Sequence, residues 1–85
     1  MQLKLYYFAQ LREALGINQE QIDCPPDVKN VGQLRAWMGA RSGPYIDAFA
    51  QSQNIRCAVN RVVADDNQYL SAGCEIAFFP PVTGG

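Results

Sequence analysis

The residues with the clearest chemical potential lie at the C-terminus, where the chain ends in FFPPVTGG, residues 78–85. Pro80 and Pro81 have no backbone N–H, and Pro80 favours extended geometry at Phe79, so a strand must end here while the chain stays stiff. Residues 80–85 reach roughly 20 Å at about 3.3–3.6 Å per residue. We therefore expect them to form an extended, flexible tail that can enter another protein.

The last two residues, Gly84 and Gly85, have no side chain and leave the terminal carboxylate unhindered. With a pKa of about 3.3–3.7 this carboxylate is an anion at neutral pH and a poor electrophile, so a nucleophile can replace its oxygen only after the carboxylate has been activated, for example as a mixed anhydride. A frayed end is the alternative reading of a bare Gly-Gly terminus. We expect Gly85 to be the reactive residue and the segment before it to thread a channel: Pro80, Pro81, Val82, Thr83 and Gly84.

Composition limits what the rest of the chain can do. With 85 residues, of which 48% are hydrophobic, the chain is expected to form one domain around one core. The net charge is -1 and no basic run is present, so nucleic acid is not an expected partner. No segment approaches the roughly 20 apolar residues that span a bilayer, and the start lacks the pattern of a signal peptide, so we expect a cytoplasmic protein without membrane contacts.

The residue types used most often in catalysis and metal binding are scarce. Histidine is absent, and the three cysteines (Cys24, Cys57 and Cys74) are far apart with no C-x-x-C pair. This pattern predicts reduced, buried thiols and indicates neither a disulfide framework nor a zinc site. The sequence 65–67, Asp-Asp-Asn, lacks the spacing of a calcium loop and is expected to be a solvated turn. We expect no metal and no tightly bound cofactor.

The tail must be held by a small α+β domain. Alternating and helical patterns predict a helix that starts at Asn30, with Gln33 three residues later, and follows an apolar stripe to Arg41. Trp37 lies on that stripe and is expected to be core. The remaining expected elements are strands at 2–8, 20–24, 55–59, 62–64 and 74–79, and short helices at 9–15 and 45–50. This order predicts a roll in which a mixed sheet packs on one main helix.

Two aromatic residues are expected on the solvent side of the sheet. Phe8 shares its strand phase with Lys4, and Phe79 shares its phase with Glu75. Clustered exposed aromatics usually mark an interface, although a helix or loop could also cover them.

Three stretches of the sequence resemble one known family. FFPPVTGG closely resembles the C-terminus of the small subunit of molybdopterin synthase, the MoaD family of ubiquitin-like sulfur carriers. YYFAQLREALG at residues 6–16, LSAGCEIAFFPPVTGG at residues 70–85 and the Val59-Asn60 pair are also similar to that family. The resemblance covers nearly the whole chain and is weak between residues 43 and 53. One departure is Cys74, where the family usually has Asp, which could alter the turn at Gly73.

The resemblance implies a ubiquitin-like β-grasp domain over residues 1–79, with the tail at 80–85. It implies that an E1-like activating enzyme uses ATP to adenylate Gly85, which then becomes a thiocarboxylate. The large catalytic subunit, in an expected heterotetramer, would use this sulfur to build molybdopterin from a pyranopterin precursor. Phe8, Val63 and Phe79 match family positions that contact the large subunit. The chain itself would be a sulfur-donating subunit without catalytic groups.

Three alternatives share this fold and this terminus. The chain could carry sulfur for thiamine synthesis or tRNA thiolation, it could be a ubiquitin-like modifier that is joined to lysines, or it could be a β-grasp binding module with an idle tail. The C-terminal sequence FFPPVTGG and the chain length favour the molybdenum pathway.

Overall fold

The computed structural model describes residues 1–41, 43–50 and 55–80, which form one mixed sheet and the helices that pack on it. The predicted α+β roll is confirmed, with its main helix between the second and third strands. In chain order the elements are β1 (Gln2–Tyr7), α1 (Ala9–Leu15), β2 (Gln19–Asp23), α2 (Val31–Gly39), α3 (Pro44–Ala48), β3 (Arg56–Val59), β4 (Val62–Ala64) and β5 (Glu75–Phe79).

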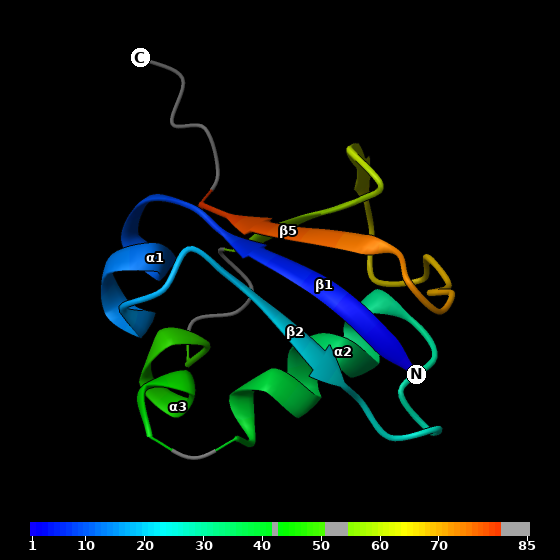
Figure 1. The fold of residues 1–85 in the computed structure, drawn as a ribbon, viewed down its shortest axis with the longest axis horizontal. Helices are drawn as coiled ribbons and strands as arrows, with labels where there is room; N and C mark the ends of the chain where they lie inside the picture. The colour runs from blue at the N-terminus through cyan, green and yellow to red at the C-terminus, as the bar shows by residue number, and fades with distance from the viewer. Residues whose placement is uncertain (42, 51–54, 81–85) are drawn as a thin grey trace.

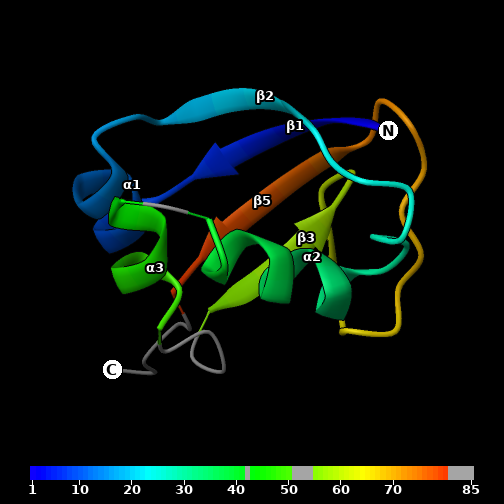
Figure 2. The ribbon, with the colours of Figure 1, turned by 90° about the horizontal axis from the view of Figure 1, so that it is seen from below.

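The sheet has the strand order β2-β1-β5-β3-β4. The first and last strands, β1 and β5, lie side by side in parallel, and the other neighbours are antiparallel. Figure 1 shows the helices on one side of this sheet, and Figure 2, from below, shows them in front of it. The other side of the sheet carries no helix in the part of the chain described; we call it the helix-free face.

The main helix starts as its sequence predicts. The Asn30 side chain accepts a hydrogen bond from the Gln33 backbone N–H at 2.8 Å, and the Gln33 side chain accepts one from the Lys29 N–H at 2.8 Å. These bonds satisfy two donors that a helix start would otherwise leave free. The helix ends earlier than predicted, because Gly39 is its last residue and Arg41 already lies outside it.

The core lies between the sheet and the helices, and β1 shows the expected alternation. Leu3, Leu5 and Tyr7 are buried, while the residues between them face away from the helices. The three cysteines are buried, as predicted. Trp37 packs against the core but stays half-buried, so its prediction as a core residue is only partly right. The Arg41 guanidinium lies over the Trp37 ring, with its carbon 5.2 Å from the ring centre.

The short helix α3 differs from its predicted range by starting at Pro44 and ending at Ala48. Proline fits the first turn of a helix, where its missing N–H has no intrahelical partner. Phe49 follows the helix and is buried against Phe78 in an edge-to-face contact, with ring centres 5.2 Å apart. No helix in the described residues is long and apolar enough to cross a membrane.

Candidate functional site

The root of the C-terminal tail is anchored in the core. Phe78 is fully buried and stacks with Tyr7 of the neighbouring strand, with ring centres 6.4 Å apart and an interplanar angle of 11°. The Phe8 N–H donates a hydrogen bond to the Phe78 carbonyl at 3.2 Å. Phe79 ends β5, and Pro80 follows outside the strand. The chain therefore leaves the domain from a fixed point beside the end of β1.

The tail residues beyond that point, Pro81, Val82, Thr83, Gly84 and Gly85, lie outside the described residues. Their threading role and the reactivity of Gly85 stay predictions. Pro80 is described and is half-buried at the tail root.

The predicted interface residues Phe8, Val63 and Phe79 all lie on the helix-free face. Phe8 is 48% exposed and Val63 is 64% exposed, whereas Phe79 is half-buried. The solvent-side phase of the two aromatics is therefore confirmed, and the described helices lie on the other side of the sheet (Figure 1). Their role in binding a partner stays a prediction.

Small residues separate these larger ones across the sheet. The strand register places Tyr6 opposite Ala77, Ala77 opposite Ala58, and Ala58 opposite Val63. Directly paired residues project on the same face of a sheet, so these side chains form one row across four strands.

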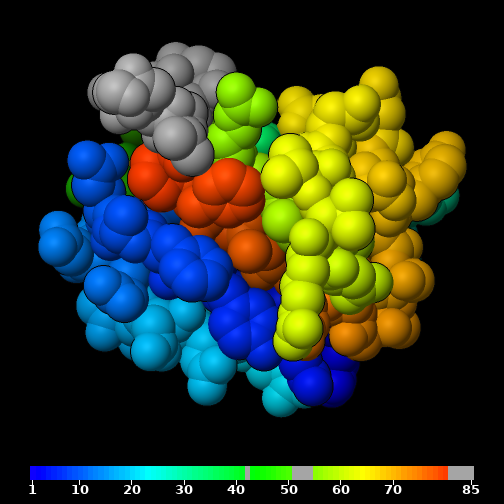
Figure 3. All heavy atoms as spheres, turned by 90° about the horizontal axis from the view of Figure 1, so that it is seen from above, coloured from blue at the N-terminus to red at the C-terminus, as the bar shows by residue number. Residues whose placement is uncertain are grey.

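Tyr6 and Ala77 of this row border a hollow of ≈ 240 Å³, whose other lining residues are Phe8, Arg61 and Glu75. We call it the outer groove. Figure 3 shows the β3–β4 hairpin, in yellow, standing beside the orange β5 and the blue β1 on this face. Sequence reasoning missed Arg61, Glu75 and Ala77 as parts of a surface site, because only the sheet register brings them beside Phe8.

The hairpin that borders the outer groove is held by Asn60. Asn60 and Arg61 have positive φ angles of 50° and 72°, as the two central residues of a tight hairpin turn require. The Asn60 N–H donates to the Glu75 carbonyl at 2.8 Å, and the Asn60 side-chain oxygen accepts from the Glu75 N–H at 2.9 Å. The turn is thus fixed against the start of β5. The Arg61 side chain is 89% exposed, with its Nε 4.0 Å from a Glu75 oxygen.

A second polar cluster, which sequence reasoning also missed, centres on the half-buried Glu20. One carboxylate oxygen, Oε2, accepts hydrogen bonds from the hydroxyls of Tyr7 and Tyr45, both at 2.6 Å. The Arg41 guanidinium lies 3.5 Å from the same oxygen and stacks over the Tyr45 ring at 3.9 Å from its centre. The cluster connects α3 and the segment that follows α2 to β1 and β2. It holds the Tyr7 ring that stacks on Phe78. We therefore assign the cluster a structural role.

The Glu20 cluster predicts a specific alkaline stability loss. Burial, reinforced by the hydrogen bond and negative charge of Glu20, raises the pKa of Tyr7 well above its ordinary value. Folding therefore favours the neutral phenol, so its contribution is complete below about pH 10, where the unfolded tyrosine is also neutral. It falls as the pH rises above that value. Tyr7→Phe should cost about 1 kcal/mol at pH 7 and should flatten this alkaline fall.

Urea unfolding at several pH values between 7 and about 11 measures this effect. Tyr69→Phe is the matched control, because Tyr69 is 74% exposed and lies outside the cluster. The control should keep the full alkaline fall of the original chain. Equal alkaline slopes for Tyr7→Phe and the original chain would show that the Tyr7 hydroxyl does not couple folding to protons.

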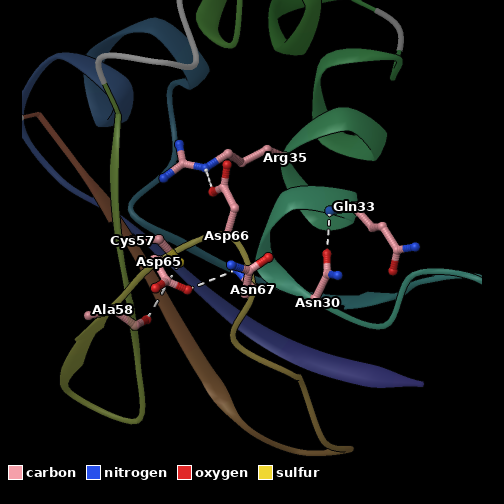
Figure 4. A network of polar contacts seen from close by, with 8 residues as sticks. All are labelled: Asn30, Gln33, Arg35, Cys57, Ala58, Asp65, Asp66 and Asn67. Carbon is pink, nitrogen blue, oxygen red and sulfur yellow. Dashed lines mark hydrogen bonds and ion pairs between the residues drawn. The ribbon is translucent and has the colours of Figure 1, made fainter.

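The acidic turn at residues 65–67 makes a hydrogen bond within itself and an ion pair with α2, as Figure 4 shows. Asp65 Oδ1 accepts the Asn67 N–H at 2.9 Å, and Asp66 Oδ1 pairs with Arg35 Nε at 2.8 Å. The Asp66 carbonyl accepts the Gly32 N–H at 3.0 Å, which joins this turn to the first turn of α2. All three residues are exposed, so the predicted solvated turn is confirmed. Among the described residues, no group of His, Cys, Asp or Glu could hold a metal ion.

The buried cysteines are poorly placed for nucleophilic chemistry. Desolvation raises the pKa of Cys57 to about 11 and also raises the pKa of Cys24. A thiol with a raised pKa carries little thiolate at neutral pH, and the thiolate is the reactive form. Cys74 is also buried, and its N–H donates to the Ser71 carbonyl at 3.1 Å within a turn where Gly73 has a φ of 82°. The turn therefore forms with cysteine in place of the usual Asp.

A family model described as the ThiS family matches residues 5–85. The chain belongs to this family. It is 36% identical over 83 residues to the molybdopterin synthase sulfur carrier subunit of Escherichia coli, an alignment that covers 98% of this chain and 99% of the relative. The predicted resemblance to these sulfur carriers is confirmed.

Solved structures show the same fold. SAMP1 of Haloferax volcanii, a small archaeal modifier protein, is 27% identical, and the match covers 100% of both chains with a TM-score of 0.73. A complex of subunits 1 and 2 of the molybdopterin-converting factor from Helicobacter pylori contains a chain that is 22% identical, with 100% of both chains covered and a TM-score of 0.68. The ubiquitin-like β-grasp fold expected from the sequence is confirmed.

Proposed function

We propose that this chain is the sulfur carrier subunit of a molybdopterin synthase. The observation that carries the proposal is the likeness to the Escherichia coli carrier, which extends from end to end of both chains. The structure adds a tail root fixed in the core and an exposed apolar surface beside it. Such a domain is suited to present its terminus while partner proteins supply the catalytic groups.

The terminal chemistry has three steps. A Gly85 carboxylate oxygen attacks the α-phosphorus of ATP, which releases pyrophosphate and leaves an acyl-adenylate. A hydrosulfide-level nucleophile then attacks the acyl carbon, AMP leaves, and the product after proton loss is a thiocarboxylate. In the synthase this sulfur bonds to the pyranopterin precursor, and water cleaves the acyl–sulfur bond to restore the carboxylate. A dithiolene contains two sulfurs, so two loaded carriers are consumed for each molybdopterin.

The chain acts as carrier and substrate in each of these steps. It has no histidine, and its buried thiols have little nucleophilic character, so an E1-like activating enzyme supplies the groups that bind ATP. The large subunit of the synthase supplies the groups for sulfur transfer, in a heterotetramer with the carrier. These steps take place in the cytoplasm, without nucleic acid, membrane or a tightly bound cofactor of the carrier itself.

The surface of Phe8, Val63 and Phe79 is the proposed contact with the large subunit. Replacing Phe79 with Ala removes an aromatic side chain beside the tail root, and it should weaken the complex by about 1–3 kcal/mol if this residue is an interface anchor. Isothermal titration of the large subunit measures this change. Tyr69→Ala is the control, because it truncates an exposed aromatic outside the patch. Unchanged affinity with a large loss of fold stability would instead identify Phe79 as a structural residue.

A second function, as a protein modifier, is favoured by the likeness to SAMP1. A modifier and a sulfur carrier share the adenylation of the terminal glycine and differ in the group that attacks the adenylate. A lysine amine would give an isopeptide bond, whereas sulfide gives a thiocarboxylate. Mass spectrometry of cell extracts distinguishes them, since Arg61 is the last Lys or Arg of the chain, so digestion with trypsin would leave residues 62–85 of a modifier attached to the lysines of other proteins.

Reconstitution tests the proposed function. Thiocarboxylated carrier, the large subunit encoded in the same genome and the pyranopterin precursor are mixed, and molybdopterin is measured. We expect molybdopterin to form while the carrier returns to its carboxylate mass, with two carriers consumed per product. A thiocarboxylated carrier that binds the large subunit but keeps its sulfur through the incubation would contradict the proposal.

A further inference from the structure

The outer groove extends the proposed contact surface beyond its three large apolar residues. Tyr6 and Phe8 of the β1 side form one wall, Arg61 of the hairpin turn forms the opposite wall, and Ala77 of β5 lies between them. Ala77 pairs with Ala58, so two small residues lie next to each other at the centre of the face. A surface that is shallow over alanine and bordered by aromatic rings fits an inserted apolar side chain.

The groove is continuous with the root of the tail. Its central residue, Ala77, lies two residues before Phe79 on the same strand and on the same face. A protein that grips the tail beyond Pro80 therefore lies next to the groove. Of the two proteins proposed to hold the tail, we assign the groove to the large subunit of the synthase, because Phe8 belongs both to the groove lining and to the proposed contact with that subunit.

Charges around the groove indicate what accompanies the inserted side chain. On β1, β5, β3 and the hairpin turn, the helix-free face carries the exposed basic residues Lys4, Arg56 and Arg61 against one acidic residue, Glu75. The chain as a whole has a net charge of -1, whereas this part of the helix-free face has an excess of basic residues. Arg61 is held only weakly, since its Nε lies 4.0 Å from Glu75 and its side chain is 89% exposed. It is available for a carboxylate of the partner.

We propose that the outer groove is a specificity pocket for the large subunit, which inserts one apolar side chain over Ala77 and places a neighbouring carboxylate on Arg61. The inference rests on the proposed function and adds to it a steric and a charged determinant. Small size at position 77 is then a binding requirement, because a larger side chain would fill the space that the partner occupies. Ala77 lies on the helix-free face, so a larger side chain at this position would not enter the core.

Filling the groove tests the steric part. Ala77→Leu should raise the Kd for the large subunit by about tenfold or more, with an unchanged melting temperature. Ala72→Leu is the matched control, because Ala72 is exposed in the connection before β5 and lies outside the groove. The control should bind within about twofold of the original chain. Titrations use full-length carrier and the purified large subunit encoded in the same genome.

Reversing the charge tests the other part. Arg61→Glu keeps a Cβ at the same turn position, so the backbone strain is unchanged, and it should slow association and reduce its dependence on salt. If the original chain binds the large subunit tightly and Ala77→Leu binds it with the same Kd, the groove inference is overturned and the proposed function stays intact. Failure of the original chain to bind the large subunit at all would overturn both.

Discussion

Removing Gly85 alone should abolish thiocarboxylate formation and molybdopterin synthesis while the thermal unfolding curve stays unchanged. The deletion leaves a carboxylate on Gly84, but that carboxylate lies about 3.3–3.6 Å short of the position that the original terminus reaches. Adenylation needs the reacting atoms within bonding approach, and a displacement of this size exceeds what positioned chemistry tolerates. The last core residue among those described is Phe78, so the loss of a terminal glycine removes no core contact.

Adding a third glycine after Gly85 provides the matched comparison. This variant retains every original residue and places the carboxylate one residue length, about 3.3–3.6 Å, beyond the position that the original terminus reaches. Both variants should fail to form the thiocarboxylate, and both should still bind the large subunit through Phe8 and its neighbours. Activity in the shortened chain would show that the terminus is not held at a fixed distance from the reacting centre.

Gly84→Val should reduce product formation by about a hundredfold or more without changing the fold. If the activating enzyme and the synthase grip the tail in extended form, a β-branched side chain at position 84 must meet the channel wall. The clash cannot relax by swinging the tail, because the prolines at 80 and 81 limit backbone rotation near the root. Measurements of melting, large-subunit binding and molybdopterin formation on one preparation separate these effects.

Gly84→Ala supplies the graded control, since it adds a single carbon. Its activity should lie between that of the original chain and that of the valine variant. Full activity in Gly84→Val would mean that the tail is not enclosed by either partner. A lower melting temperature in the same variant would mean that the tail stabilises the fold, which would contradict the expectation that the tail makes no core contact.

Much of the fold follows from local sequence patterns. The alternation of Leu3, Leu5 and Tyr7 predicts the buried face of β1, and the pair Asn30 and Gln33 predicts the start of α2. Local rules were less accurate where a helix ends. Arg41 continues the helical spacing, yet it lies beyond α2. Its guanidinium binds Glu20 and stacks on Tyr45, contacts that the spacing does not predict.

The parts that the sequence did not reveal depend on long-range register. Glu20 meets Tyr7 and Tyr45, which are 13 and 25 residues away along the chain, and no periodic pattern connects such positions. The outer groove likewise requires Ala77 of the last strand to lie beside Tyr6 of the first, which follows from their parallel pairing. The tail is the opposite case, because the chemistry proposed for it depends on local residue types: proline for stiffness and glycine for access.

The central claim is that the terminal carboxylate of Gly85 is converted into a thiocarboxylate. The most direct measurement is the intact mass of the chain after incubation with the E1-like activating enzyme, ATP and a sulfide donor. We expect the mass to rise by the difference between one sulfur and one oxygen atom, only when ATP is present, and fragmentation should place the change on the last residue. An unchanged mass, with an activating enzyme that loads a known sulfur carrier in the same experiment, would contradict the account.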